Sequence, residues 1–316
     1  MLLADKSAIL TYMPELPDIE LYVDRIRERV AGERLEKLRI HSPFVLRSVG
    51  VSPSDIEGQV ATEVFRLGKR IVIGFGEMFV LIHLMIAGRL RWIFPPPVEK
   101  KAQGRILLAS LRFSSGQLDL IETSTKKRAA VYLIRGRAGL DVHRREGLDV
   151  FTASPEAFSD RIQAQNRTLK RILADPHSFD GIGNAYSDEI LFAARLSPLR
   201  LTRSLEPDEV ERLHEAAKGV LGYWRAHLRD LYPSFPKPGD ITAFRPEFAV
   251  HGRFNLPCQV CGKPVQRIVY AENETDYCAH CQNEGRLLAD RSLSRLLKSD
   301  WPSTLEEMLE GRKPPA

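Results

Sequence analysis

Four cysteines constrain this chain more tightly than any other feature. Cys258 pairs in sequence with Cys261 and Cys278 with Cys281, sixteen residues separate the two pairs, and the 316-residue sequence has no other cysteine. Two C-x-x-C pairs at this spacing are typical of a zinc ribbon, and Gly262 permits the tight turn that a zinc knuckle needs. Because four thiolates leave no open coordination position, the pattern predicts one structural Zn²⁺ ion.

Two other interpretations of the cysteines stay open. The four thiols could be incidental, or His280 could replace one cysteine as a ligand. The matched pairs already saturate a tetrahedral metal, which favours the four-cysteine site. With no cysteine left for disulfides, we expect a reducing compartment.

Charge and hydropathy narrow the class of protein. Lys and Arg number 46 against 41 Asp and Glu, a formal net charge of +5, which suits a polyanionic partner but is common among enzymes. No apolar run approaches the roughly 18 residues of a membrane helix, and the N-terminus lacks the pattern of a secretory signal. We expect a soluble intracellular protein, of the cytoplasmic, nucleoid-associated bacterial type.

The chain changes character near Asp149. Before it, short apolar runs alternate with turn signals and predict a β-sandwich, preceded by an amphipathic helix over about 17–31. After it, helical periods begin near Ser154, where Pro155 and Glu156 form a capped start, and continue past Trp224. The predicted strands cover residues 71–75, 79–84, 88–94, 106–113, 117–121, 130–134 and, between the cysteine pairs, 265–270.

These patterns predict an α+β protein with an N-terminal β-sandwich and flanking helices, a helical domain and a C-terminal zinc ribbon. We expect an N-terminal extension, a sandwich domain, a helical DNA-binding domain, a zinc-ribbon domain and a C-terminal tail. Their expected bounds are 1–12, 13–149, 150–245, 246–290 and 291–316.

The string Met13-Pro-Glu-Leu-Pro-Asp-Ile-Glu20 resembles the opening of the formamidopyrimidine-DNA glycosylase and endonuclease VIII family. The resemblance implies that Pro14 attacks the sugar C1′ carbon through its amine and that Glu15 acts as general acid. A proline followed by an acidic residue is also typical of a plain helix N-terminus.

Twelve residues precede this motif. Within the full chain the nitrogen of Pro14 is a tertiary amide without a free lone pair, so it cannot be a nucleophile. Translation starting at Met13, cleavage of the extension, or absence of imine chemistry would each resolve this, and we expect that the true start is Met13.

Two further segments continue the resemblance. Lys69, within Arg66-Leu-Gly-Lys-Arg70, matches the family's hairpin lysine, which engages the DNA backbone and assists elimination; a solvated hairpin lysine is the plain alternative. His83-Leu-Met-Ile-Ala-Gly88 resembles the segment whose methionine fills the gap left by a flipped base. Ile86 stands at that position here, with Met85 one place earlier, and packing of this segment into the core is the alternative.

Thr123-Ser-Thr-Lys-Lys-Arg-Ala129 occupies the place of the family's Asp-Pro-Arg-Arg-Phe-Gly loop. Lys126, Lys127 and Arg128 keep the positive charge, whereas the phenylalanine that enters the duplex is missing. The sequence therefore does not determine lesion and opposite-base preference, and a solvated basic loop is the alternative interpretation of this segment.

Thr168-Leu-Lys170 together with Gly181-Ile-Gly-Asn-Ala-Tyr-Ser-Asp-Glu-Ile-Leu191 resembles the family's helix-two-turn-helix. Lys170, Gly183 and Asn184 are its predicted DNA contacts, with Asn184 as the cap of a helix starting at Ala185. In the ribbon, Asn273 replaces an arginine that grips phosphates, so we expect weaker binding or less complete elimination.

The resemblance implies a base-excision-repair glycosylase that removes oxidised bases, formamidopyrimidine and 8-oxoguanine first, from duplex DNA and nicks abasic sites. It implies a monomer that uses no nucleotide cofactor and no membrane. Two alternatives remain: a non-catalytic protein of the same fold that binds damaged DNA, and a structural RNA-binding protein. The Pro14-Glu15 start and Lys69 argue against both, because binding alone requires neither.

Overall fold

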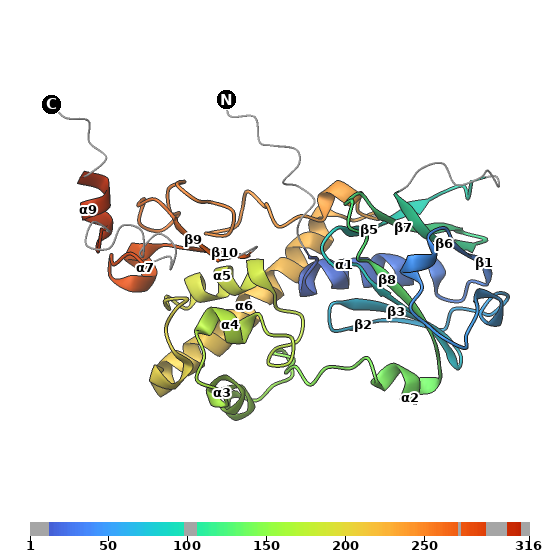
Figure 1. The fold of residues 1–316 in the computed structure, drawn as a ribbon, viewed down its shortest axis with the longest axis horizontal. Coiled ribbons are helices and arrows are strands. Elements are labelled where there is room, and N and C mark those ends of the chain that lie inside the picture. The colour runs from blue at the N-terminus through green and yellow to red at the C-terminus, as the bar shows by residue number, and fades with distance from the viewer. Residues whose placement is uncertain (1–12, 98–105, 271–272, 289–301, 311–316) are drawn as a thin grey trace. The chain divides into compact units, whose positions relative to one another are not determined.

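The computed structural model describes residues 13–97, 106–270, 273–288 and 302–310 (Figure 1). The chain divides into two compact units. Unit 1 comprises Met1–Arg145 and Tyr223–Ala243, and unit 2 comprises Glu146–Gly222 and Phe244–Ala316. The predicted extension and most of the predicted C-terminal tail lie outside the described residues.

Unit 1 begins with helix α1 (Leu16–Val30), close to its predicted bounds. Pro17 lies in the first turn, where a missing N–H costs nothing, and the N–H of Glu15 donates to the Asp18 carboxylate at 3.1 Å. The predicted apolar face is confirmed, because its members are at most 4% exposed: Ile19, Val23, Ile26 and Val30.

The predicted β-sandwich is confirmed, and two four-stranded antiparallel sheets form it (Figure 1). The sequence patterns did not single out two of its strands, β1 and β2. The first has the order β2-β3-β4-β8, with bounds Glu63–Leu67, Arg70–Phe75, Met78–His83 and Ala130–Arg135. The second has the order β1-β6-β7-β5, with bounds Leu35–Ile40, Leu107–Phe113, Gly116–Glu122 and Gly88–Ile93. Short 3₁₀ turns occupy Pro43–Val45, Pro53–Asp55 and Pro238–Asp240.

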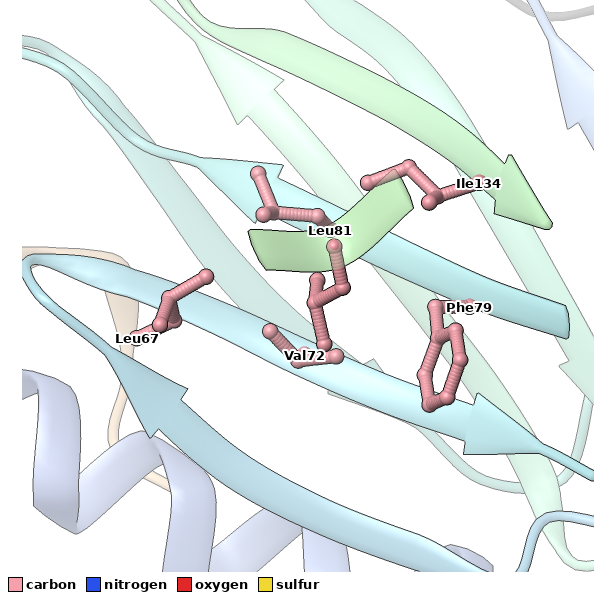
Figure 2. Close-up of a cluster of buried hydrophobic side chains, with 6 residues drawn as sticks. Leu67, Val72, Phe79, Leu81 and Ile134 are labelled. Atoms are coloured by element: carbon pink, nitrogen blue, oxygen red, sulfur yellow. The ribbon is translucent and has the colours of Figure 1, made fainter. Parts of the chain in front are cut away.

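Strand β3 after Arg70 and strand β4 before His83 are buried at every residue because both faces of their sheet are covered. Helix α1 packs against β2 and β3, and the short helix α2 (Gly136–Asp141) packs against β8 and β4. One face carries the cluster drawn in Figure 2, formed by Leu67, Val72, Phe79, Leu81, Ile134 and Leu140. This cluster is part of the core of unit 1.

Unit 2 contains the helices predicted after Asp149. Helix α3 (Pro155–Gln163) starts at its predicted cap, where the Ser154 hydroxyl accepts the Ala157 N–H at 3.2 Å. Helices α4 (Leu169–Leu173) and α5 (Asn184–Ala193) and a 3₁₀ turn (Thr202–Ser204) follow. Helix α6 (Pro207–Leu231) contributes residues to both units.

The expected cap of helix α5 is wrong by one residue. Asn184 is the first residue of the helix, and Gly183 is its cap, with extended backbone at φ −136°. Because the first residue of a helix already has helical backbone angles, the side chain of Asn184 cannot fill the capping role that the sequence suggested.

The ribbon completes unit 2. Strands β9 (Gln266–Tyr270) and β10 (Asn273–Tyr277) form a hairpin, followed by α7 (Ala279–Asn283) and, farther along, α9 (Leu305–Glu310). Leu305 packs against Tyr277 and Ala279. Among the described residues, no helix has the length and apolar character needed to cross a bilayer.

Candidate functional site

The strand register of unit 1 gathers most of the predicted site residues at one end of the sandwich. His83 lies opposite Arg70 on one side and Ala130 on the other. In the second sheet, Gly88 lies opposite Glu122. The β2–β3 turn, the β4–β5 turn and the β7–β8 loop therefore all leave the sheets at this end.

Helix α1 directs its N-terminus toward the same end. Arg27, in its last turn, donates to the Val64 carbonyl at 2.7 Å, whereas Glu20 lies 3.6 Å from Arg66, nearer the β2–β3 turn. The helix thus runs antiparallel to β2, and Pro14 and Glu15 precede it on the side of the turn. Pro14 is buried and Glu15 is 1% exposed.

Lys69 sits in the β2–β3 turn, within a positively charged environment. Burial, together with the charges of Arg70, Arg145 and Lys69, lowers the pKa of His83 from 6.5 to about 4. His83 is therefore neutral near pH 7, and the surrounding cations create a positive potential that favours a phosphate.

Met85 and Ile86 lie in the tight turn between β4 and β5, and both are half-buried. Met85 has a positive φ of 53°, and the Gly88 N–H donates to the Leu84 carbonyl at 2.9 Å. A side chain at Gly88 would collide with that carbonyl, so only glycine fits.

Arg89 holds this turn from inside the protein. It is 1% exposed, and its guanidinium donates to the carbonyls of Ile86 at 3.1 Å, Gly88 at 2.8 Å and Ile241 at 3.0 Å. Because a buried cation is costly unless its donors are satisfied, these bonds fix the turn that carries Met85 and Ile86.

Glu122 holds the basic loop in a similar way. Its buried carboxylate accepts the N–H groups of Arg128 at 2.9 Å and Ala129 at 3.1 Å, and Lys127 donates to its carbonyl. Lys126 and Arg128 are exposed, whereas Lys127 is half-buried. The loop thus presents two of its three predicted cations to solvent.

In unit 2, the residues of the predicted helix-two-turn-helix surround the start of α5. Gly181 has a positive φ of 81°, Gly183 caps the helix, and Asn184 is half-buried in its first turn. Lys170 is only 8% exposed, and its ammonium lies 2.6 Å from the Asp188 carboxylate. Its charge is therefore already paired within the unit.

The four cysteine sulfurs converge in the ribbon, all within 4.8 Å of one another. The sulfurs of Cys258 and Cys281 are 3.9 Å apart, and those of Cys261 and Cys278 are 3.5 Å apart. Zn–S bonds of about 2.3 Å in a tetrahedron place sulfurs about 3.8 Å apart, and a disulfide would need about 2 Å. Gly262, with φ 72°, forms the expected knuckle turn, so the sulfurs fit a zinc ion.

Asn273 begins β10 opposite Tyr270, next to the hairpin tip. Residues 271–272 and the side chain of Asn273 lie outside what the structure describes.

Sequence reasoning did not single out Arg89 or Glu122, although both hold site loops. The available signals were Arg89 beside the apolar residues of strand 88–93, and Glu122 directly after Leu120 and Ile121. Neither pattern predicts which backbone groups these charged side chains would bind, because those groups are brought together only by the fold.

Three family models match the chain. The formamidopyrimidine-DNA glycosylase N-terminal domain matches residues 13–131, the H2TH domain of the same enzymes matches 148–223, and the zinc finger found in FPG and IleRS matches 255–283. The zinc-finger match and the converging sulfurs identify one structural Zn²⁺ site.

Relatives match over most of their length. The formamidopyrimidine-DNA glycosylase of Thermus thermophilus is 33% identical over 282 residues, which cover 86% of this chain and 100% of that protein. That of Exiguobacterium sibiricum is 28% identical, covering 85% of this chain and 99% of that protein.

Solved structures share the fold. The crystal structure of the MutM (FPG) protein from Thermus thermophilus has a TM-score of 0.71 at 29% identity, covering 86% of this chain and 100% of that one. A Lactococcus lactis FPG mutant in complex with DNA containing Fapy-dG has a TM-score of 0.74 at 22% identity, covering 85% and 100%.

Proposed function

The chain belongs to the formamidopyrimidine-DNA glycosylase family, and on that premise we propose that Pro14 is the nucleophile with which it excises oxidised bases from duplex DNA. The protein is a DNA glycosylase of base-excision repair, a class that also cleaves abasic sites. The convergence of the α1 start, Lys69, the β4–β5 turn and the basic loop at one end of the sandwich supports the proposal.

The chemistry follows from a secondary amine. The lone pair of Pro14 nitrogen adds to the sugar C1′ carbon, and the bond to the damaged base breaks, with its electron pair leaving on the base, which takes up a proton. Opening of the sugar ring then leaves an iminium between Pro14 and C1′. The iminium acidifies the neighbouring C2′–H, and loss of that proton expels the 3′ phosphate.

Glu15 and Lys69 serve this sequence in different ways. Glu15 adjoins the amine and protonates the ring oxygen as the sugar opens. Lys69, in the positive environment that depresses the pKa of His83, binds the DNA backbone and offsets charge on the departing phosphate. His83 itself is a neutral DNA contact in this proposal.

The amine must be free for this mechanism, so we propose that the working enzyme begins at Pro14 after removal of Met13. The N-terminal domain model begins its match at residue 13, which supports that start. A proline after the initiator Met favours Met removal.

The remaining DNA contacts follow the predicted pattern. Met85 and Ile86 fill the space of the extruded base, and Lys126, Lys127 and Arg128 lie against the backbone of the distorted duplex. In unit 2, Lys170, Gly183 and Asn184 shape a phosphate site at the start of α5, and Asn273 contacts a phosphate without adding charge. We propose that formamidopyrimidine-type purine lesions are the preferred substrates. We also propose that the enzyme acts in the cytoplasm, on the DNA of the nucleoid.

Borohydride trapping tests the nucleophile. A chain beginning at Pro14 is incubated with duplexes that carry an abasic site or 8-oxoguanine, beside Pro14→Gly and the chain beginning at Met1. We expect a covalent adduct from the first, much less from Pro14→Gly, and none from the extended chain, whose proline nitrogen is an amide.

Glu15→Gln separates binding from chemistry. It should lower single-turnover excision by about 100-fold or more while leaving duplex affinity unchanged. Absence of adduct from zinc-loaded protein that still binds damaged DNA would instead favour the non-catalytic binding protein. Preference for structured RNA over duplex DNA in a mobility-shift assay would favour the RNA-binding alternative.

A further inference from the structure

A buried network of charged side chains lies between helix α5 and the ribbon, within unit 2. Asp188, on α5, accepts the Lys170 ammonium at 2.6 Å and the His251 Nδ1–H at 2.8 Å. It also accepts the backbone N–H of Asp276, on β10, at 3.2 Å. The side chains of Asp188 and Asp276 are fully buried, and that of His251 is 4% exposed.

The network extends into the hairpin through Asp276. Its carboxylate accepts the Gly252 N–H at 2.7 Å and the Arg267 Nε–H at 3.0 Å, and it lies 3.9 Å from His251 Nδ1. Helix α5 is thereby linked to the segment that enters the ribbon and to both hairpin strands.

Glu189, the next residue on α5, adds a second attachment. Its buried carboxylate accepts three successive N–H groups from residues 249–251, at 2.7, 2.9 and 2.8 Å. The segment before the first cysteine pair is thus held at its backbone as well as through the His251 ring.

The network contains three carboxylates, those of Asp188, Glu189 and Asp276. They face three cationic groups when His251 is protonated: the imidazolium and the side chains of Lys170 and Arg267. Burial alone would lower the pKa of His251, but the Asp188 carboxylate raises it above its ordinary value. Because buried ions are costly unless paired and hydrogen-bonded, these pairings offset part of the cost of burying the charges.

A metal does not explain the cluster well. Ligand atoms of Asp188, His251 and Asp276 lie within 4.8 Å of one another, as a cation site would require. However, the Asp188 and Asp276 oxygens already accept donors, and the Lys170 ammonium supplies positive charge at 2.6 Å. The geometry is that of an ion-pair network.

The two ends of the network are proposed DNA contacts. Lys170 also donates to the carbonyl of Asn184 at the start of α5, and Asp276 lies on the strand that begins at Asn273. On the opposite face of the hairpin, Tyr277 packs against Leu305 in an apolar cluster. Apolar packing tolerates sliding, whereas directed hydrogen bonds set one register.

We propose that Asp188, His251 and Asp276 are positioning residues that hold the ribbon hairpin in register with the start of helix α5, so that both engage the DNA backbone together. The DNA contacts in this inference rest on the proposed function. The network itself rests on the distances within unit 2.

Salt-dependent DNA binding tests the inference. His251→Gln and Asp188→Asn are compared with wild type for zinc content, Tm and affinity for a duplex carrying a tetrahydrofuran abasic analogue. We expect zinc to stay bound and Kd to rise about tenfold. The magnitude of the slope of log K against log [salt] should fall by about the amount that one phosphate contact contributes. The isosteric Asp188→Asn guards against misfolding of the histidine variant.

Leu305→Ala is the matched control, because it loosens the apolar face of the same hairpin without touching the charges. At a comparable loss of Tm it should leave the salt slope unchanged. An equal change of slope in Leu305→Ala, or a wild-type Kd and slope in both network variants with zinc bound, would overturn the inference.

Trapping at saturating DNA keeps the two proposals apart. In His251→Gln and Asp188→Asn we expect the single-turnover rate at saturation to stay near wild type while KM rises. Failure of the chain that begins at Pro14 to form an adduct would count against Pro14 and leave the affinity comparison intact.

Discussion

Arg89 and Glu122 in unit 1 and Asp188 in unit 2 are buried charges whose partners differ in kind. In unit 1, Arg89 is satisfied by three backbone carbonyls and Glu122 by two backbone N–H groups. In unit 2, Asp188 meets Lys170 and His251. A charge satisfied by backbone fixes the loop it touches, whereas opposed charges on separate elements fix those elements to each other.

The sandwich and the ribbon also differ in their apolar cores. The sandwich buries whole strands, including the cluster of Figure 2 around Val72 and Phe79. The ribbon has a small cluster of Val250 and Val265 with Cys258 and Cys278. Short modules rarely stabilise themselves by apolar burial alone, so the ribbon adds a metal and an ion-pair network.

Loss of zinc should have the largest effect and should be confined to unit 2. Zinc ribbons gain on the order of 10 kcal/mol from the metal, so Cys258→Ser or chelation should unfold residues 255–283 and abolish DNA binding. Hydrogen exchange should rise there while β3 and β4 stay protected. His280→Ala is the control, because it is exposed and should keep its zinc. Zinc loss in that variant would revive histidine as a ligand.

Removing core volume should act on unit 1 alone. Phe79 is 1% exposed, so Phe79→Ala should cost about 3–5 kcal/mol in the free energy of unfolding, measured with denaturant. Phe44→Ala, at a side chain 76% exposed, should change it by less than about 0.5 kcal/mol. If zinc content fell with Phe79→Ala, the two units would not be independent in stability.

Removing the buried guanidinium of Arg89 should have the next largest effect on the free energy of unfolding. Arg89→Met leaves three carbonyls without their donor and should cost about 2–4 kcal/mol, with a larger loss of excision than of affinity as the β4–β5 turn loosens. Arg144→Met removes an exposed pair with Asp141 and should be nearly neutral. Equal effects from the two variants would contradict a holding role for Arg89.

The last prediction is that the stability of the two units depends on pH in opposite directions, through His83 in unit 1 and His251 in unit 2. His83 has a folded pKa of about 4, below its ordinary 6.5, so the unfolded chain binds more protons between these values and unit 1 loses stability as pH falls from 6.5 toward 4. The loss is at most about 3 kcal/mol. His251 has a raised folded pKa, so its contribution is full below 6.5 and declines as pH rises through that pKa.

Hydrogen exchange across pH, resolved by unit, measures both slopes. His83→Gln should flatten the acid-side slope in unit 1, and His251→Gln the alkaline-side slope in unit 2. If stability changed with pH in the same direction in both units, the predicted opposite roles of His83 and His251 would be wrong.

The amino-acid sequence by itself determined the modules and their order. Most strand and helix positions followed from the spacing of apolar residues, although strands β1, β2 and β10 were not singled out. The zinc site followed from two cysteine pairs with Gly262 behind the first. The start motif at Met13 identified the family. These features depend on residues close together in the chain, so local pattern is enough to detect them.

Only the tertiary structure decided which buried charges matter. Arg89 meets Ile241 across 152 residues, and Asp188 meets the N–H of Asp276 across 88. The sequence predicts Lys170 as a DNA contact but does not show that its ammonium also pairs with Asp188 inside unit 2. Whether a charged side chain is solvated, satisfied by backbone or paired depends on which distant segments the fold brings within about 3 Å, and no local period encodes that.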